Sequence, residues 1–394
     1  MKNSKKEMKA LQAERAMLYR DAARFRKPER IPHFANAVTW KVFDAGHTLD
    51  EVMTDQKLME SCVRHFLDTY YVDGLIDTGI RNQFNVTEAF GDGFYYYYTP
   101  ETVAIHDHAH CTVDTLQEYL DDPVKYAWEK ILPEKFGDGW ANKPLSVWKK
   151  TFREYLKYIM FIVHMAGVSA SYGIPVTAPN NPSKGSIDIG MEILESNLLG
   201  IRQLSIALRR NADIIEDFCR KWDAQHIDPI IEKNLAGDGP NCKYCFDASI
   251  LMLAHNIMSP KQFERFYQPT LKRLLQSYED KNMNVRIFTE GKILGMKDFF
   301  RDYAPGTLTF HIELDDVFEV RKELPNICIM GGLTTDLLYG GTPEECMEQT
   351  RKLCDELGSD GGFILSEGKM LSFRNDANSD NFKAICDFMK DYRN

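Results

Sequence analysis

The sequence lacks any apolar run long enough to cross a membrane. Its most apolar window, residues 158–167, is about half as long as the roughly 20 residues that a transmembrane helix needs. The first 25 residues are charged, with a helical pattern and no apolar core of the signal-peptide type. Nine cysteines, an odd number scattered along the chain, fit a reduced compartment. We therefore expect a cytoplasmic protein with no membrane partner.

Positive charge is also scarce. The 48 lysines and arginines are outnumbered by 58 aspartates and glutamates, which gives a formal net charge of -10. A nucleic-acid binder would need clustered positive charge, so we expect no nucleic-acid partner. Small-molecule chemistry and protein partners remain open.

Paired metal-binding motifs are missing as well. The single C-x-x-C, Cys242 to Cys245, has no second pair of the kind that structural zinc sites use. It begins a predicted strand instead of a helix, which disfavours a redox site. Residues 106–111 (HDHAHC) contain three histidines, but alternate residues of a strand share one face. We interpret this run as the exposed polar face of a strand.

The last third of the chain contains a series of short apolar strand patterns. Residues 285–289 read as a buried strand that ends at Glu290 and Gly291. Similar strand patterns follow at 307–313, 326–331 and 362–367, with helical patterns at 315–323 and 342–357. This alternation indicates parallel strands joined by crossover helices. A carboxylate at the carboxyl end of such a strand lies where an α/β barrel keeps its chemistry.

The first half of the chain contains clear signals for where helices begin and end. Residues 1–27 are predicted to form a helix with its lysines and glutamates mainly on a solvated face, ended by the proline-containing segment 28–32. Thr48 and Glu51 have the spacing of a capping box, which predicts a helix start.

Further β-structure is predicted in this half. Residues 94–98 and 102–112 are predicted to form a β-hairpin, and residues 174–177 a strand before a loop that extends to Ser186.

A stripe of aromatic and methionine residues runs through the helical stretch 116–172. Its members are Trp148, Phe152, Tyr155, Met160, Phe161 and Met165. Core packing is the better interpretation, although such stripes also line pockets for flat substrates.

Residues 258–269 (MSPKQFERFYQP) resemble the "SPe-F-ef--P" signature of the uroporphyrinogen decarboxylase superfamily. Other segments resemble its "PDRvPv", "aE--G", "gTPEEV" and "GGfil...eN" elements, at residues 28–32, 88–91, 341–345 and 361–381. The resemblance covers about residues 20–392 and implies an α/β fold, a distorted (β/α)8 TIM barrel with its site at the carboxyl ends of the strands. We therefore predict an N-terminal helical extension over residues 1–27 and a barrel over residues 28–394 with a β-hairpin insertion.

The superfamily contains two chemistries. Decarboxylases share an arginine-rich loop of the form RQAGR, whose counterpart here, residues 34–38, reads FANAV. The four acetate side chains of uroporphyrinogen need several guanidinium partners, and this sequence has no such arginine cluster. A uroporphyrinogen-type decarboxylase is therefore only the alternative function, as is a non-catalytic barrel that binds a tetrapyrrole. The other branch consists of methyltransferases that work with a corrinoid protein. The family resemblance also implies a homodimer.

The methyltransferase branch often binds zinc through His-x-Cys and a later Cys, and this sequence departs from that pattern. Glu290 stands in the segment that corresponds to His-x-Cys-Gly, and Lys369 stands where the last Cys would be. Two interpretations remain open. Glu290 could join His311 and a neighbouring glutamate as a metal ligand, or it could pair with Lys369 in an acid–base site without metal.

Methyl transfer from an ether or amine requires protonation of a poor leaving group. The candidates for this general acid are Glu290, His311 and Glu367. In residues 307–313, His311 and Glu313 share one face of the strand. The residues predicted to bind substrate are Asp77, Asp247, Glu313 and Lys369.

We therefore predict a demethylating methyltransferase that moves a methyl group from a small methylated donor to a corrinoid protein. Methoxylated aromatics are one donor class that the aromatic-rich middle of the chain suggests. The sequence has no D-x-H-x-x-G cobalamin-binding motif, so the corrinoid (cobalamin) is expected on a partner protein.

Overall fold

The computed structural model describes residues 4–81, 83–91, 96–105, 109–137, 139–179 and 187–393. No helix among these residues is long and apolar enough to span a membrane.

The centre of the fold is a parallel sheet with the strand order β2-β1-β9-β8-β7-β6-β5. The strands are β1 (His33–Ala35), β2 (Gly74–Leu75), β5 (Ala248–Met252), β6 (Val285–Thr289), β7 (Leu308–Ile312), β8 (Cys328–Leu333) and β9 (Phe363–Glu367). The four strands predicted in the last third of the chain are confirmed as β6 to β9. The strand predicted at residues 174–177 is reduced to one parallel bridge, from Val176 to Tyr244, and a second bridge joins Ile187 to Ile250 of β5.

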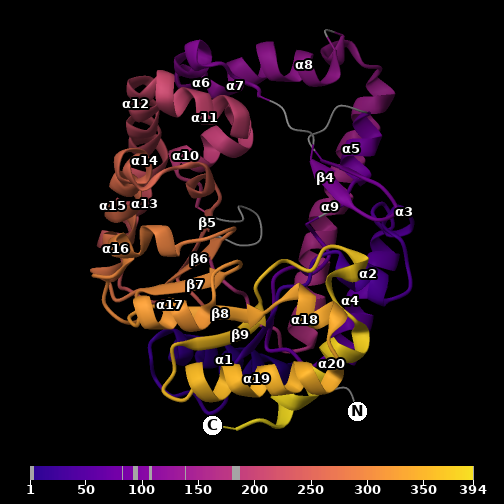
Figure 1. Cartoon of the computed structure of the whole chain (residues 1–394). Helices are drawn as coiled ribbons and strands as arrows, with labels where there is room; N and C mark the ends of the chain where they lie inside the picture. Colours follow the sequence, from indigo (N-terminus) through magenta and orange to yellow (C-terminus); the bar gives the residue numbers. More distant parts are fainter. Residues whose placement is uncertain are drawn as a thin grey trace.

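Helices surround this sheet and extend well beyond it (Figure 1). They are α1 (Lys5–Ala23), α2 (Trp40–Asp44), α3 (Leu49–Val52), α4 (Gln56–Thr69), α5 (Asn85–Phe90), α6 (Leu116–Asp121), α7 (Pro123–Tyr126), α8 (Leu132–Phe136), α9 (Leu145–Ser171), α10 (Gly190–Ile193), α11 (Gly200–Arg210), α12 (Ala212–Trp222), α13 (Asp228–Ala236), α14 (Pro260–Gln262), α15 (Gln268–Glu279), α16 (Lys297–Phe300), α17 (Val317–Glu323), α18 (Thr335–Gly340), α19 (Pro343–Leu357) and α20 (Ser379–Asp391). In Figure 1, α5 and α9 lie on the opposite side of the molecule from α12 to α16.

The sheet is curled into a barrel. The guanidinium of Arg286 on β6 lies 5.5 Å from the ring centre of Phe34 on β1, although β7, β8 and β9 separate these two strands in the sheet. Such a contact is made across the interior of a barrel and not along a flat sheet. The side chains that alternate with them in sequence, such as Ile287 and Ala35, belong to the cluster between sheet and helices.

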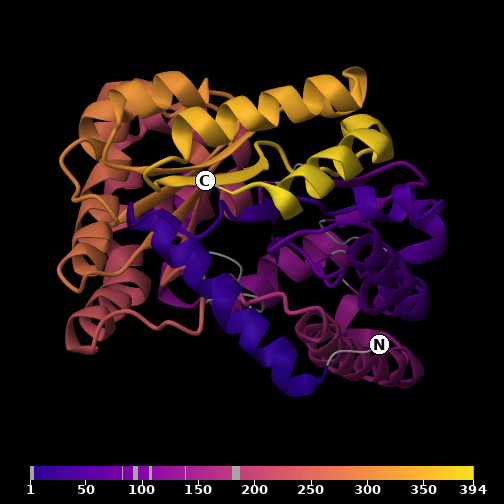
Figure 2. The same ribbon diagram turned by 90° about the horizontal axis from the view of Figure 1, so that it is seen from below.

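The amino end of the barrel is closed by α1, which crosses its underside (Figure 2). Tyr19 is fully buried in a cluster with Phe34, Met330 and Ile364 of the barrel strands, and its hydroxyl donates to the carbonyl of His33 at 3.0 Å. The helix predicted at residues 1–27 is therefore confirmed over Lys5–Ala23. One of its faces is part of the core.

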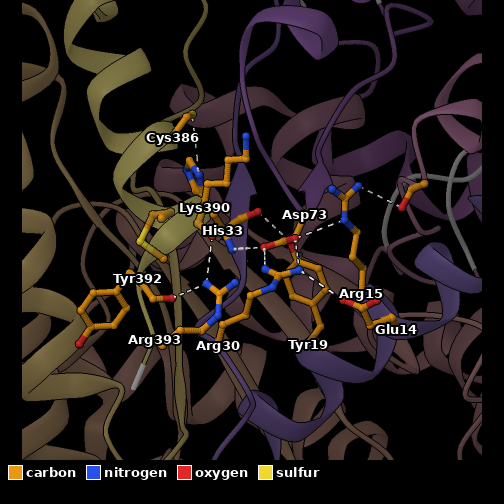
Figure 3. Close-up of polar contacts among 12 residues, drawn as sticks. Glu14, Arg15, Tyr19, Arg30, His33, Asp73, Cys386, Lys390, Tyr392 and Arg393 are labelled. Carbon is orange, nitrogen blue, oxygen red and sulfur yellow. Dashed lines mark hydrogen bonds and ion pairs between the residues drawn. The ribbon is translucent and has the colours of Figure 1, made fainter. Parts of the chain in front are cut away.

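Ion pairs fasten α1 to the barrel (Figure 3). Asp73, just before β2, accepts two hydrogen bonds from Arg30 at 2.6 and 2.7 Å, and Arg15 of α1 lies 3.3 Å away. The backbone N–H of His33 also donates to Asp73, at 3.0 Å. All four residues are buried, so this cluster joins α1, β1 and β2 at the end of the barrel opposite to the carboxyl ends of the strands.

The predicted β-hairpin is confirmed as β3 (Tyr96–Tyr98) and β4 (Val103–Ile105), which pair antiparallel. The first histidines of the run at residues 106–111 lie outside the described residues. His110 is described, and its side chain is 7% exposed and 3.5 Å from Glu134. The interpretation of this position as part of an exposed strand face is wrong, because the chain leaves the hairpin before His110 and buries it.

Candidate functional site

The carboxyl ends of β6 and β7 bring Glu290 and Glu313 together. Thr289 is paired with Ile312 in the sheet, so the next residues of the two strands, Glu290 and Glu313, lie beside each other. The backbone N–H of Gly291 donates to the Glu313 carboxylate at 2.7 Å. The two glutamates that the sequence indicated at this edge therefore share one site.

Glu290 is a partly buried carboxyl group with a raised pKa. Burial is the main cause, and the like charges of Glu313 and Glu195 act in the same direction, whereas Arg81 lowers the pKa. Removing a carboxylate from water and placing it beside other carboxylates disfavours its charged form. Glu290 is consequently the site's candidate proton donor.

The backbone at Glu290 is held by a short helix that follows β5. Asn256, in the 3-10 helix η6 (Ala254–Ile257), donates through Nδ2 to the Glu290 carbonyl at 2.5 Å. Gly291 has φ of 87°, and a Cβ there would lie 2.1 Å from Oδ1 of Asn256. Only a glycine combines this backbone conformation with so close an approach.

A buried glutamate supports η6 from behind. Glu192 of α10 accepts hydrogen bonds from the backbone N–H groups of Leu253 and Ala254 at 3.1 and 3.2 Å and from the Tyr267 hydroxyl at 2.5 Å. Burial raises the pKa of Glu192 to about 8. Glu192 thus positions Asn256, and through it the loop of Glu290.

Asp77, beyond the carboxyl end of β2, organises the loop that presents Arg81. Its carboxylate accepts from the backbone N–H groups of Gly79 at 3.0 Å and Arg81 at 3.2 Å. It also lies 3.7 Å from the ammonium of Lys41, a buried group whose pKa burial lowers to about 8. Asp77 is therefore at the predicted end of the barrel, where it supports a loop through backbone contacts.

His311 lies inside the barrel below this edge, between the rings of Phe288 and Phe34 at 4.9 and 6.5 Å. The Arg286 guanidinium is 2.8 Å from Nδ1. A guanidinium can only donate, so Nδ1 accepts, and Nε2 donates its proton to the Glu367 carbonyl at 2.8 Å. Burial, with Arg286 beside it, keeps the pKa of His311 well below its usual range. This neutral ring has both nitrogens engaged, which leaves it unsuited to proton delivery.

Arg286 is itself unusual, because it is a buried cation that contacts neutral groups, while the positive charge of Arg81 acts on it from nearby. Its guanidinium contacts His311 and, at 3.3 Å, the Ser249 hydroxyl, and it lies 5.5 Å from the ring centres of Phe34 and Phe288. Burial lowers the pKa of Arg286 to about 10. It therefore remains charged at neutral pH and orients His311.

Glu367 does not face the barrel interior. Its carboxylate accepts from the backbone N–H of Asn36 at 2.5 Å and lies 3.3 Å from Nε2 of His33. His33 in turn contacts Cys386 and Phe382 of α20. The last residue of β9 points to the helix layer because it alternates with Ser366, so the predicted role as a catalytic acid is not supported by its placement.

Two of the predicted substrate-binding residues also lie elsewhere. Asp247 precedes β5 and is at the amino end of the barrel, where it is paired with Arg20 of α1 at 2.8 Å. Lys369 is paired with Asp376 at 2.8 Å, and it does not form the ion pair with Glu290 that was one of the two interpretations. Asp247 lies at this end because β5 begins directly after it, at Ala248.

The residues of this site do not fit the zinc centre of the methyltransferase branch. Among the described residues, no three His, Cys, Asp or Glu side chains gather so that they could hold a metal ion. The candidate ligand pair Glu290 and His311 fails on the chemistry of the histidine, since both of its ring nitrogens are already engaged. We therefore derive no step through zinc.

Sequence reasoning missed Arg81, Glu192, Glu195 and Arg286. Arg286 had a visible signal, since it is a lone charge in a strand of apolar residues. Burying a charge is costly unless it is compensated, so such a residue calls for an explanation. The others come from loops and helices whose approach to the barrel depends on the tertiary fold.

Comparisons with known proteins agree with the predicted superfamily. Residues 230–392, somewhat less than half of the chain, match the family model described as Uroporphyrinogen decarboxylase (URO-D). Among solved structures, the chain is similar to a methyltransferase from Methanosarcina mazei with a TM-score of 0.54 and 13% identity, over 95% of this chain and 97% of that one. No curated protein matches the sequence. The family model thereby confirms the resemblance to the uroporphyrinogen decarboxylase superfamily over residues 230–392, and the similar fold agrees with the distorted barrel.

Proposed function

We propose that this chain, a barrel of the uroporphyrinogen decarboxylase superfamily, is a methyltransferase that moves a methyl group from a small methylated donor to a corrinoid protein. The observation that carries the proposal is the carboxyl group of Glu290, whose pKa is raised at the carboxyl end of β6. The methyltransferase of similar fold supports the reaction class.

The chemistry needs an acid at this position. In an ether donor the bond between the methyl carbon and oxygen breaks, and its electron pair stays on the oxygen. Glu290 gives that oxygen a proton, so the product leaves as a neutral alcohol or phenol and not as an alkoxide. The methyl carbon is taken by an electron pair of the reduced corrinoid, which we expect the partner protein to carry.

The neighbouring residues keep this proton available. Glu313 and Glu195 raise the pKa of Glu290, and Arg81 limits the rise. Glu313 also binds the backbone N–H of Gly291, so the carboxyl groups are held in a fixed relation. Inside the barrel, His311 and Arg286 are buried and contact each other at 2.8 Å. Methoxylated aromatics are the first donor class to test.

Methyl transfer to free cob(I)alamin tests the proposal. The purified chain is incubated under anaerobic conditions with cob(I)alamin and a panel of methoxylated benzenes and methylated amines, and methylcobalamin is followed by its absorbance. Glu290→Gln should lower the rate by about 10² to 10⁴, the usual contribution of a general acid. Glu319→Gln, an exposed glutamate on α17, is the matched control. Unchanged turnover in Glu290→Gln would contradict the assignment of the acid.

Decarboxylation is the second candidate, because the family model carries that description. A porphyrinogen with four acetate groups would need several cations at the mouth, whereas the charged groups that act on Glu290 there are Glu313, Glu195 and one cation, Arg81. We expect no carbon dioxide from uroporphyrinogen. Its release, together with failure of every methyl donor, would replace the methyltransferase proposal with the decarboxylase.

A further inference from the structure

Helix α9 has two apolar faces, and the barrel side of the molecule uses only one of them. Phe161, Met165 and Val168 are buried in a cluster with residues of α2 to α4. A second set of large apolar side chains on the same helix is between 41% and 72% exposed. This exposed stripe consists of Leu145, Phe152, Tyr155, Leu156, Ile159, Met160 and Val163.

The stripe lies opposite the buried face. At 3.6 residues per turn, its members cluster on one side of α9, about 175° from the mean direction of Phe161, Met165 and Val168. A helix that is apolar on two opposite sides is expected to be buried on both. Scattered exposed apolar residues need no explanation, but seven on one face over five turns of helix form a continuous surface.

The size of the stripe matches a protein interface. Large side chains carry about 150–250 Å² each, so seven at these exposures present on the order of 800 Å². Each partner in a stable interface of standard size contributes about 800 Å². A second copy of the chain with the same stripe would supply an equal surface.

The two edges of the stripe differ, and this difference selects a pairing. One edge carries Lys149, Arg153 and Lys157, three cations of which the last two share one carboxylate, Glu154. The other edge carries the exposed Tyr155 beside Trp148, whose ring packs against Phe90 and Trp140. Two antiparallel copies of α9 related by a two-fold axis would bring their basic edges to the same side, where like charges repel. A two-fold axis parallel to α9 instead places the basic edge of each copy against the aromatic edge of the other, an arrangement that favours cation–π contacts.

We infer that the exposed stripe of α9 is the contact surface of a two-fold dimer of this chain in which the two α9 helices run parallel. The inference is independent of the proposed methyl transfer. It assigns a surface and an orientation to the homodimer that the family resemblance only implied, and it explains why the stripe is apolar although the barrel leaves it uncovered.

Sedimentation equilibrium tests the association. The parent should sediment at twice the chain mass of 45.4 kDa, and Phe152→Glu combined with Met160→Glu should sediment as a folded monomer. Leu235→Glu, at an exposed apolar position on α13, is the control and should remain a dimer. A monomeric parent at tens of micromolar, or a dimer that survives the double substitution, would overturn the inference. So would binding of a monomeric parent to anionic vesicles, which would assign the stripe to a lipid surface.

Disulfide cross-linking tests the orientation. In a Cys242→Ser background, which removes the exposed thiol, Leu145→Cys and Ile159→Cys are oxidised separately. In a parallel pair each residue faces its own copy, so both variants should form covalent dimers. The two positions are about 21 Å apart along the helix, and an antiparallel pair has only one point at which a residue meets its own copy. Cross-linking of just one variant would therefore contradict the parallel arrangement.

Discussion

The pKa of Glu290 depends on burial and on neighbours of both charge signs. Burial and the negative charge of Glu313 raise this pKa, and the positive charge of Arg81 lowers it. The sequence placed Glu290 and Glu313 correctly, because a carboxylate just after a buried parallel strand has only one edge of the sheet on which to lie. It did not place Arg81, whose loop reaches the site from β2 at the far edge of the sheet.

The pH dependence of methyl transfer should move in opposite directions when these neighbours are changed. The protonated form of Glu290 is the active one, so the rate falls as pH rises through its pKa. Glu313→Gln removes a cause of the raised pKa and should shift this alkaline limb to lower pH. Arg81→Gln removes the lowering charge and should shift the limb to higher pH. The measurement is the pH profile of kcat for methylcobalamin formation.

Glu319→Gln serves as the control for both variants, since it removes an exposed charge that is not among the groups shifting the pKa of Glu290, and it should leave the limb in place. Shifts of the two variants in the same direction would show that the limb does not report Glu290.

His311 and Glu367 show where prediction at the level of single residues ends. The sequence shows which residues of a strand share a face, but not which face is turned to the barrel interior, so it did not reveal that Glu367 points to the helix side of β9. It also did not reveal that Arg286 contacts one ring nitrogen of His311 and the Glu367 carbonyl the other. The partners of a buried polar group come from distant strands, so local sequence carries little information about them.

At the scale of elements, strands were easier to predict than helix faces. The strands β6 to β9 are buried on both sides, and their apolar runs read directly as parallel strands. The capping box at Thr48 was also right, with the Thr48 N–H donating to Glu51 at 3.0 Å. The stripe of α9 was interpreted as core, and this is wrong for Phe152, Tyr155 and Met160, which are exposed. Helical periodicity reveals an apolar face but not what covers it.

The turn after β6 depends on a glycine, and this gives a second prediction. Gly291→Ala should lower the free energy of unfolding by about 1–3 kcal/mol from the positive φ alone, with a further loss from the collision with Asn256. Asn256→Ala alone should cost about 1 kcal/mol for its hydrogen bond. In the double variant the collision is relieved but the φ strain remains, so the combined loss should be smaller than the sum of the single losses.

Urea unfolding of the four proteins measures this cycle. Losses that simply add would mean that the loop relaxes away from Asn256, and that η6 does not hold Glu290 in place.

At the scale of the whole molecule, the first helix belongs to the barrel. Its lysines and glutamates suggested a solvated extension, but Arg15, Tyr19 and Arg20 are buried. A periodic charge pattern describes the outer face of a helix and says little about the few polar residues on its inner face. The sequence predicted that Arg15 and Arg20 are in a helix but not that they are buried, because their partners Asp73 and Asp247 are distant in sequence.

The stability of the barrel should consequently depend on α1. Deleting residues 1–23 would expose the apolar cluster at the amino end of the barrel and leave Asp73 and Asp247 buried without Arg15 and Arg20. Breaking one buried ion pair typically costs about 3–5 kcal/mol, a large part of the roughly 5–15 kcal/mol that stabilises a folded domain. We expect the truncated chain to lose its near-ultraviolet circular dichroism and its cooperative urea transition.

Arg15→Met in the full chain, which keeps the helix and its packing, should show a reduced transition midpoint with the same cooperativity. A truncated protein that unfolds like the parent would mean that residues 1–23 are a dispensable extension and that the barrel closes its amino end without them.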